Sequence, residues 1–421
     1  MHDILMLENV IQEYDWGSRS LIPGLMGTRS PSDKPQAELW MGAHPKAPSK
    51  VKVKGDWIPL DKWIDANTQT ALGKDVSKRF EGKLPYLFKV LAAGKPLSIQ
   101  AHPNKKQAAE GFIRENAMGI PLNASNRNYK DPNHKPECIT AVTPFLGMNG
   151  FRYRDDIFRF FNKLNLTQEK ALKPAMDSLL SVSDASLGLK SFFNVLMTLP
   201  AEKQKTVLTK AVFEAENLME TDPTPEFQWL IMLSRFYPGD IGVLSPLFLN
   251  LIELKPGEAM FLDAGELHAY LSGLGIEIMA NSDNVLRGGL TPKHVDIPEL
   301  MKVLTFSERK PAIKTPVSLN ACEKVFEPDT FFPEFRLSVI DISRKNDYIY
   351  QRSLSRNNES ARLGGPEILF VTEGSVMVFT EKSKKKIHLS KGESAFVPDS
   401  VDSYTLSGTA RLYKAAAPPI G

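Results

Sequence analysis

The chain has 421 residues, which is long for a single domain and predicts two or three domains. Apolar residues make up 42% of the chain and charged residues 24%, as in an ordinary soluble globular protein. The formal net charge is only +3, from 52 basic and 49 acidic residues, which excludes binding to nucleic acid through a large basic surface. The basic tract Lys382–Lys386 is interrupted by Ser383 and is typical of an exposed hairpin tip.

Cysteine content and hydropathy indicate where the protein works. The two cysteines, Cys138 and Cys322, are too few for a disulfide framework in a chain of this size and fit a reducing compartment. No apolar run approaches the ~20 residues that are needed to span a bilayer, and the N-terminus has no signal-peptide pattern. We therefore expect a cytoplasmic protein that has no membrane partner.

The first part of the chain predicts strands. Up to about residue 150, short apolar runs alternate with glycine and proline, as in strands that end at turns. Leu84–Leu91 and Leu97–Pro103 are examples of such runs. Pro31–Pro35 and Asn123–Pro132 predict surface loops.

The next block predicts helices. From Arg154 to about Tyr237 the apolar residues recur at helical spacing, which is typical of helix faces that pack in a core. Asp184 and Thr221–Pro223 are helix-start signals. A block of this length is large enough to have a core of its own, so we expect residues 153–240 to form an inserted helical domain.

After the helical block the strand-and-turn pattern returns, and its clearest part is Gly257–Ser272. A glycine turn comes first, then a short apolar strand, a second turn at Ala264–Gly265, and His268 at the start of another apolar strand. A short helix is predicted at Ile297–Leu304. Pro311–Pro316 is predicted to link this region to the following domain.

A second copy of the same pattern occurs at Gly392–Ser403, where Ser403 replaces His268. Such internal repetition predicts two domains of one fold. The pattern resembles the second sequence motif of the cupin β-barrels, in which the histidine binds a metal. We expect a mainly β protein with two cupin-type jelly-roll barrels. Residues 1–152 and 241–310 would form the catalytic metal-binding domain, and residues 311–421 a degenerate domain without a metal site.

One histidine cannot hold a metal by itself, and the sequence upstream supplies further candidates. Gln100 and His102 stand two residues apart, on one face of a predicted strand. The run Asn133–Glu137 supplies a carboxylate. Two imidazoles, a carboxylate and an amide oxygen suit Zn²⁺ with one position free for water or substrate oxygens. The candidate ligands are Gln100, His102, Glu137 and His268.

Five longer motifs resemble those of the type I mannose-6-phosphate isomerases, in the same order and along the whole chain. They are Gln12–Gly17, Ala37–Gly42, Ser98–Lys105, Tyr129–Glu137 and Ser282–Lys293. The last two contain the Asn-His-Lys-Pro-Glu and Ser-Asp-Asn runs, which are specific to that family. Ala101 and Gly288 stand where relatives often have another small residue.

This resemblance implies an enzyme that interconverts mannose 6-phosphate and fructose 6-phosphate with one bound Zn²⁺, for GDP-mannose synthesis or mannose catabolism. It also implies that Gln100, His102, Glu137 and His268 are the metal ligands and that Arg287 is catalytic. A hexose 6-phosphate would be the partner. No long exposed apolar helix or heptad pattern requires a second subunit, so we expect a monomer.

The reaction moves a carbonyl from C1 to C2, which requires stabilisation of an enediolate and a group that transfers the proton. Arg287 is always protonated and can donate hydrogen bonds to the developing charge. Lys135, Asp283 and Glu277 are candidates for the base, and the sequence does not choose among them. Strand alternation puts His134 on the face opposite Lys135. If it is not turned away from the site, His134 would assist ring opening, and the alternative is a hydrogen bond that orients a ligand.

The phosphate of the substrate needs cationic or hydroxyl partners. Ser98, Lys89 and Lys293 are the candidates, and for both lysines a solvated surface position is the alternative.

Two other functions fit parts of the pattern. A cupin oxygenase would hold Fe(II) and consume O₂, but such sites usually have more imidazoles than a set that includes Gln100 and Glu137. A non-catalytic sugar-phosphate binding or regulatory protein is the second alternative. Metal analysis separates the first from an isomerase, and the Arg287→Ala variant separates the second.

Overall fold

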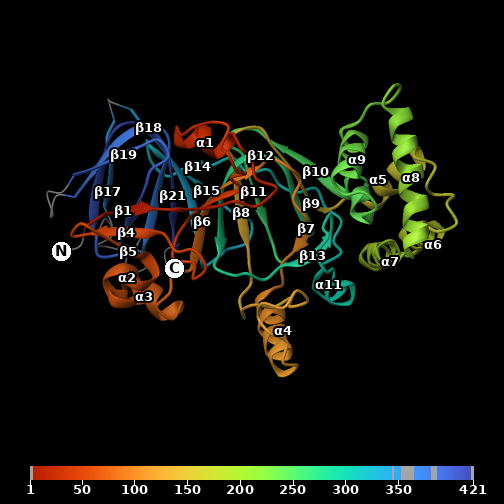
Figure 1. Ribbon diagram of the computed structural model, residues 1–421, viewed down its shortest axis with the longest axis horizontal. Helices are drawn as coiled ribbons and strands as arrows, with labels where there is room; N and C mark the ends of the chain where they lie inside the picture. The colour runs from red at the N-terminus through yellow and green to blue at the C-terminus, as the bar shows by residue number, and fades with distance from the viewer. Residues whose placement is uncertain (1–2, 344–345, 352–364, 381–385, 419–421) are drawn as a thin grey trace.

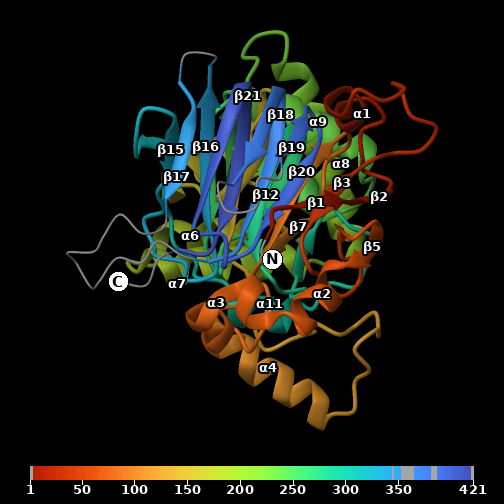
Figure 2. The same ribbon diagram turned by 90° about the vertical axis from the view of Figure 1, so that its left-hand side faces the viewer.

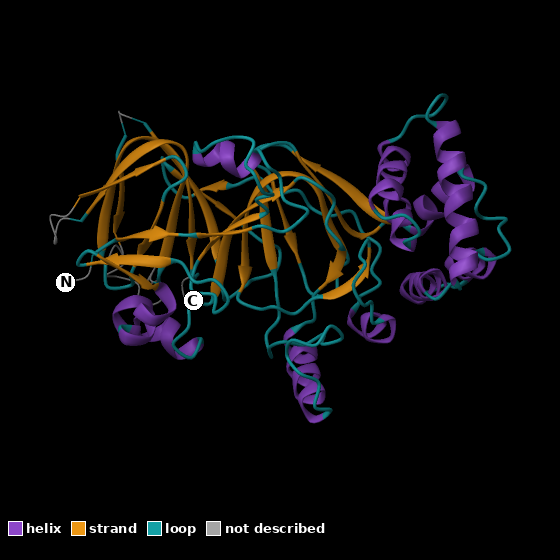
Figure 3. Ribbon diagram, viewed as in Figure 1, coloured by secondary structure: helices purple, strands orange, loops and turns teal. Residues whose placement is uncertain are grey.

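The computed structural model describes residues 3–343, 346–351, 365–380 and 386–418. The molecule is elongated, and its parts follow one another along the long axis (Figure 1). The described strands form two sheets that lie side by side. A group of helices lies at one end of the molecule, next to one of these sheets and away from the other (Figure 3). The predicted class, mainly β with an α-helical insertion, is confirmed.

One sheet, here called the central sheet, has the pairing order β10-β9-β12-β6-β3-β2, with β7, β8, β11 and β13 attached beside this path. Its strands are β2 (Val10–Gln12), β3 (Glu38–Met41), β6 (Tyr86–Ala93), β7 (Ile99–Ala101), β8 (Glu137–Ala141), β9 (Phe145–Phe151), β10 (Leu249–Leu254), β11 (Ala259–Leu262), β12 (His268–Ala280) and β13 (Leu286–Gly289). The long strand β12 pairs with β6, β7, β8 and β9, so it brings together segments from before and after the helical block.

The other sheet, here called the C-terminal sheet, has the order β14-β15-β16-β21-β18-β20-β1-β4-β5, with β17 and β19 attached beside it. Its strands are β1 (Leu5–Glu8), β4 (Lys50–Val53), β5 (Asp56–Pro59), β14 (Val317–Ser318), β15 (Glu323–Phe326), β16 (Arg336–Ile342), β17 (Tyr348–Gln351), β18 (Glu367–Phe379), β19 (Lys386–Ser390), β20 (Ser394–Val397) and β21 (Ser403–Ala416). In the described residues neither sheet closes into a complete barrel, because the pairing order of each ends at two strands that do not meet.

The N-terminal segment crosses between the predicted domains. β1 pairs with β20, with Leu5 opposite Phe396, and also with β4 (Figure 2). The two sheets share a buried cluster that contains Leu39 and Phe88 from the central sheet and Phe370 from the C-terminal sheet. Strands β1, β4 and β5 of the first 152 residues therefore extend the C-terminal sheet, while the domain limits stay a prediction.

The repeated pattern folds twice in the same way. Gly257 has a φ of +88°, β11 follows it, Gly265 has a φ of +80°, and His268 opens β12. In the second copy Gly392 has a φ of +86°, β20 follows, and Ser403 opens β21. Positive φ favours glycine because it has no Cβ, which explains the glycine that opens each copy, Gly257 in the first and Gly392 in the second. The predicted internal repeat is confirmed.

Helices occupy the inserted block and several connections. They are α1 (Leu21–Met26), α2 (Leu60–Ala66), α3 (Thr68–Arg79), α4 (Lys105–Ala117), α5 (Arg154–Lys163), α6 (Lys173–Ser181), α7 (Ala185–Met197), α8 (Ala201–Leu218), α9 (Pro225–Phe236), the 3₁₀ helix η1 (Ile241–Leu244), α10 (Ser245–Phe248) and α11 (Ile297–Val303). Asp184 caps α7 as predicted. The predicted start of α9 at Thr221–Pro223 is wrong, since the Thr224 side chain accepts a hydrogen bond from Phe227 and Pro225 begins the helix.

The inserted helices do not have a separate core. Phe192 and Phe193 of α7 belong to the same buried cluster as Phe151 of β9 and Phe248 of α10. The rings of Phe151 and Phe193 meet edge to face, with centroids 5.6 Å apart. The helical block is therefore packed directly on the central sheet, in contrast to the separate core that its length allows.

Other predictions for connections are also tested by the structure. α11 confirms the short helix predicted at Ile297–Leu304. Cys138 and Cys322 are buried free thiols. None of the described helices combines the length and the apolar character required to cross a bilayer. Of the predicted tip Lys382–Lys386, only Lys386, at the start of β19, belongs to the described residues.

A buried ion-pair cluster lies inside the C-terminal sheet. Lys414 is only 1% exposed, and its ammonium lies 2.8 Å from Glu323 Oε1 and 3.8 Å from Glu367 Oε1. The Tyr348 hydroxyl lies 3.1 Å from the same ammonium and donates to Glu323. The cluster satisfies charged groups that would otherwise be buried alone.

Replacing Lys414 with methionine should destabilise the C-terminal sheet by about 3–5 kcal/mol, because it leaves two carboxylates buried without a cation. The measurement is urea unfolding of the full chain. The control is Lys324→Met, at an exposed position on β15, which should stay close to wild type. Equal stability of the two variants would show that the cluster contributes nothing.

Candidate metal centre

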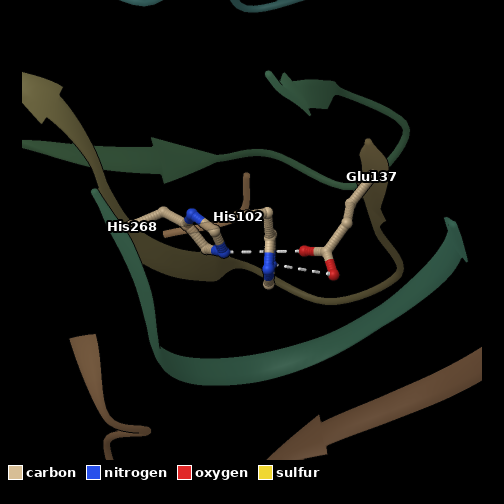
Figure 4. A group of neighbouring side chains, drawn as sticks. All are labelled: His102, Glu137 and His268. Carbon is tan, nitrogen blue, oxygen red and sulfur yellow. Dashed lines mark ion pairs between the residues drawn. The ribbon is translucent and has the colours of Figure 1, made fainter. Parts of the chain in front are cut away.

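Three side chains from separate parts of the sequence converge in the central sheet (Figure 4). His102 follows β7, Glu137 opens β8, and His268 opens β12. One potential ligand atom from each lies within 4.8 Å of the others. His102 Nε2 is 3.4 Å from Glu137 Oε1, and His268 Nε2 is 3.6 Å from Glu137 Oε2. All three side chains are buried, so their donor atoms face one another away from bulk water.

Within the described residues, three donor atoms at the centre have no hydrogen-bond partner. This holds for Nε2 of His102, Nε2 of His268 and Oε2 of Glu137, all of them buried. Buried polar atoms without partners are costly, and a cation between them would remove the cost. The residues present therefore fit a single metal ion with imidazole and carboxylate ligands.

Both imidazoles are held in the form that binds metal. His102 Nδ1 lies 2.7 Å from the Asn284 carbonyl oxygen, and His268 Nδ1 lies 3.0 Å from that of Glu266. A carbonyl only accepts, so each Nδ1 donates and leaves the Nε2 lone pair directed at the centre. Burial and the nearby Lys135 ammonium lower the pKa of His102 to about 4, which keeps it neutral.

The carboxylate at the centre is also in its ligand form. Burial alone would raise the pKa of Glu137, but the Lys135 ammonium 2.8 Å from Oε1 and the neighbouring His102 hold this pKa well below its usual value. Gln100 lies opposite His268 in the register of β7 and β12 and lines the adjoining cavity. It stays a proposed fourth ligand. Among the described residues, the C-terminal sheet has no comparable group of histidine, cysteine and carboxylate side chains.

A cavity of about 790 Å³ adjoins the convergent side chains. Its buried floor contains carboxylates and ammonium groups, and its more open side contains further cations. The predicted site residues that line it are Lys89, Ser98, Gln100, Lys135, Glu137, Glu277, Arg287 and Lys293. A volume of this size accommodates a phosphorylated sugar.

A hydrogen-bonded network forms part of the floor. Lys89 Nζ lies 3.0 Å from Glu277 Oε2 and 3.3 Å from Glu38 Oε1. The Tyr270 hydroxyl donates to Glu277 Oε1 at 2.9 Å, and the Trp40 indole donates to Glu38 Oε2 at 2.7 Å. Burial raises the pKa of Glu277, although Lys89 opposes this shift. Lys89 therefore lies in the interior, not at the solvated surface that was the alternative for it.

Arg287 occupies a different wall of the cavity. It lies on β13 opposite Gln100 of β7, next to a candidate ligand. Its guanidinium is half-buried, and burial lowers its pKa. Within the described part of the chain Arg287 forms no ion pair, so its donors stay available to an anion in the cavity.

Two of the predicted residues lie outside this cavity. His134 Nε2 lies 2.7 Å from Glu334 Oε1, which agrees with the strand alternation that turns it away from Lys135. Asp283 pairs with Lys46 at 2.7 Å and lines a separate cavity of about 370 Å³. The structure therefore brings Lys135 and Glu277 to the cavity but not His134 or Asp283.

Sequence reasoning missed Glu38 and the aromatic residues around it. Glu38 opens β3, whose four residues are all buried, and a carboxylate in such an apolar strand is a signal that marks a paired internal charge. It also missed Phe236 and Tyr237, which bring the end of α9 to the cavity. Their position depends on tertiary packing, and we find no local signal for it.

Comparison with known proteins gives a consistent result. Residues 4–154 match the family model described as phosphomannose isomerase type I, catalytic domain. Residues 160–249 match that of the phosphomannose isomerase type I helical insertion domain. Among curated relatives, mannose-6-phosphate isomerase of Escherichia coli strain K12 is 43% identical over 413 residues, which cover 96% of this chain and 97% of the relative. The Homo sapiens mannose-6-phosphate isomerase is 35% identical over 417 residues, with coverage of 94% and 93%.

Solved structures are similar over nearly the whole chain. A mutant of phosphomannose isomerase from Salmonella typhimurium superposes with a TM-score of 0.87 at 38% identity, and 99% of each chain is covered. A mannose 6-phosphate isomerase structure described as holo and zinc-bound has a TM-score of 0.86 at 39% identity, also with 99% of each chain covered.

Proposed function

Because the chain belongs to the type I phosphomannose isomerase family, we propose that it interconverts mannose 6-phosphate and fructose 6-phosphate in the cavity beside His102, Glu137 and His268. The observation that carries this proposal is the convergence, at one end of that cavity, of three buried donor atoms that have no hydrogen-bond partner in the described part of the chain. His102, Glu137 and His268 would hold Zn²⁺, with Gln100 as a fourth ligand. When bound, Zn²⁺ supplies a Lewis acid for the O1 and O2 edge of the sugar.

The proton transfer falls to Glu277 in this proposal. A base takes a proton from C2 of the open-chain aldose and returns it to C1, while the hydroxyl proton of O2 passes to O1 and the carbonyl moves to C2. Glu277 lines the cavity, its burial raises its pKa, and Lys89 and Tyr270 fix both of its oxygens. A base whose pKa moves towards the working pH transfers protons more efficiently.

The other base candidates have different surroundings. Lys135 forms an ion pair with Glu137, 2.8 Å away, so its ammonium would orient the sugar oxygens and would not remove a proton. Asp283 lies in the other cavity. Burial alone would raise its pKa, but Lys46 and His44 lower it, and the net pKa is below the usual value. These contacts favour Glu277 over both.

Charge on the enediolate and on the phosphate would be met by cations that line the cavity. Arg287 would donate to the developing oxyanion, because its guanidinium has no carboxylate partner among the described residues. Ser98 and Lys293 would contact the phosphate, whereas Lys89 is held between two carboxylates and would orient Glu277. We also propose that the enzyme is a cytoplasmic monomer that serves GDP-mannose synthesis or mannose catabolism.

Removal of the metal should abolish the activity. Exhaustive chelation should reduce turnover of mannose 6-phosphate to background. One equivalent of Zn²⁺ per chain should restore it, because the two imidazoles and the carboxylate then bind one metal ion again. The measurement is turnover together with elemental analysis.

Metal-free protein that still worked at full rate would rule out the proposed centre. One iron per chain with uptake of O₂ would instead support the oxygenase alternative. A zinc-loaded protein that binds sugar phosphate without converting it would support the non-catalytic one.

A further inference from the structure

The inserted helical block reaches the cavity through one corner, residues 236–242, between α9 and η1. Phe236 ends α9 and is 44% exposed, and both Phe236 and Tyr237 line the cavity. The chain then turns at Gly239, which has a φ of +85°, and Asp240 caps η1 by accepting a hydrogen bond from Gly242. The corner joins the helices to the wall of the cavity.

Two hydrogen bonds tie this corner to the central sheet. The Tyr237 hydroxyl donates to the Pro96 carbonyl at 2.6 Å. The Thr291 backbone N–H donates to Asp240 Oδ2 at 2.9 Å. Pro96 lies just before β7, and Thr291 lies just after β13. Each bond therefore holds one strand of the β7–β13 pair.

Both bonds act at the same end of that pair. β7 and β13 are antiparallel, with Gly289 opposite Ile99 and Arg287 opposite Gln100, so the start of β7 lies beside the end of β13. The corner thus holds the end of a two-stranded unit that carries a candidate metal ligand and the proposed oxyanion donor.

The backbone of the corner also touches this unit directly. A Cβ on Gly242 would lie 2.8 Å from the Leu290 nitrogen and 3.1 Å from the Gly289 Cα. Gly289 has a φ of +126°, a conformation that glycine adopts without strain. The two glycines allow the backbones to meet, so the strand end has little freedom to shift.

From this geometry we infer that Tyr237 and Asp240 are positioning residues, through which the helical block holds Arg287 in place for the reaction. The inference rests on the proposed function of Arg287. The displacement of a catalytic group by about 1 Å can cost 10²-fold in rate. The two hydrogen bonds at the end of the short β7–β13 pair should therefore have a large effect on the rate of the reaction.

The test compares Tyr237→Phe, which removes only a hydroxyl, and Asp240→Ala with wild type. Each variant should lose about tenfold or more in kcat with a smaller change in KM, because Arg287 acts mainly on the transition state. Zinc content should stay at one ion per chain. In Asp240→Ala, hydrogen exchange should accelerate in the segment 286–293, since the Thr291 amide loses its acceptor.

A double-mutant cycle separates positioning from general destabilisation. In an Arg287→Ala background the Asp240→Ala change should have little further effect on kcat, because the group that Asp240 positions is gone. The control is Thr224→Ala, which removes the cap at the other end of α9 and should keep wild-type kcat.

Wild-type kcat in both corner variants, an equal loss in Thr224→Ala, or multiplicative losses in the cycle would each overturn the inference. Failure of the proposed function has a different signature. Zinc-loaded wild type would then not convert mannose 6-phosphate at all, while hydrogen exchange at 286–293 would still respond to Asp240→Ala.

Discussion

Arg287→Ala should lower the turnover of mannose 6-phosphate by about 10²–10³-fold while the protein keeps one zinc ion per chain. The removal of one preorganised donor from a developing oxyanion has this magnitude of effect in other enzymes. Arg287 forms no ion pair within the described residues, so its removal leaves no carboxylate buried without a partner. The fold should therefore tolerate the change, and the loss should appear in kcat.

Three measurements define the result: kcat and KM for mannose 6-phosphate, zinc by elemental analysis, and the unfolding temperature. Arg287→Lys keeps the charge but not the planar fork of donors, and should recover part of the rate. Arg159→Ala, at an exposed arginine on α5, is the control and should match wild type. Retained turnover in Arg287→Ala would exclude a catalytic role, and loss of zinc would mean that Arg287 supports the metal centre instead.

Local patterns predicted the parts of the fold that depend on neighbours in sequence. A turn glycine, an apolar strand and a second turn predicted β11 and the start of β12 at His268, and the same pattern predicted β20 and β21. The convergence of His102 and Glu137 with His268 could be predicted because strand alternation and metal chemistry restrict which side chains combine.

Features that depend on contacts between distant segments could not be predicted. The pairing of Leu5 with Phe396 places the first strand in the C-terminal sheet, and nothing in Leu5–Glu8 distinguishes that partner from the nearer strands. The helical block has apolar faces that suit a separate core, yet Phe193 packs against Phe151 of the sheet. Sequence spacing predicts which face of a helix is buried, but it does not predict what covers that face.

The choice of base shows the same limit. Asp283 and Glu277 are both carboxylates near family motifs, and only the tertiary structure separates them. Asp283 forms an ion pair with Lys46, whereas the register of β12 and β6 places Glu277 opposite Lys89. A single charged residue in each of two buried strands is a signal for such a pair, but this signal does not reveal the cavity beside it.

Glu277→Gln should reduce kcat by about 10²–10⁴-fold, the range expected for the loss of a positioned general base. The amide can keep the hydrogen bond from Tyr270, and Lys89 keeps Glu38 as a partner, so the floor should stay folded. In wild type, product formed in D₂O should carry deuterium at C1, because the proton taken from C2 exchanges with solvent on the base. The variant should form almost no product and show no exchange at C2 of the substrate.

The contrast with Asp283→Asn makes this test decisive, because that side chain lines the separate cavity beside Lys46. Asp283→Asn should keep kcat within a few-fold of wild type if Glu277 is the base. Glu277→Asp should regain part of the activity, since it restores a carboxylate at a shorter reach. If instead Glu277→Gln exchanges the C2 proton at the wild-type rate while Asp283→Asn does not, the base lies on the Lys46 side of the centre. Which of the two variants loses kcat and C2 proton exchange therefore decides which carboxylate moves the proton.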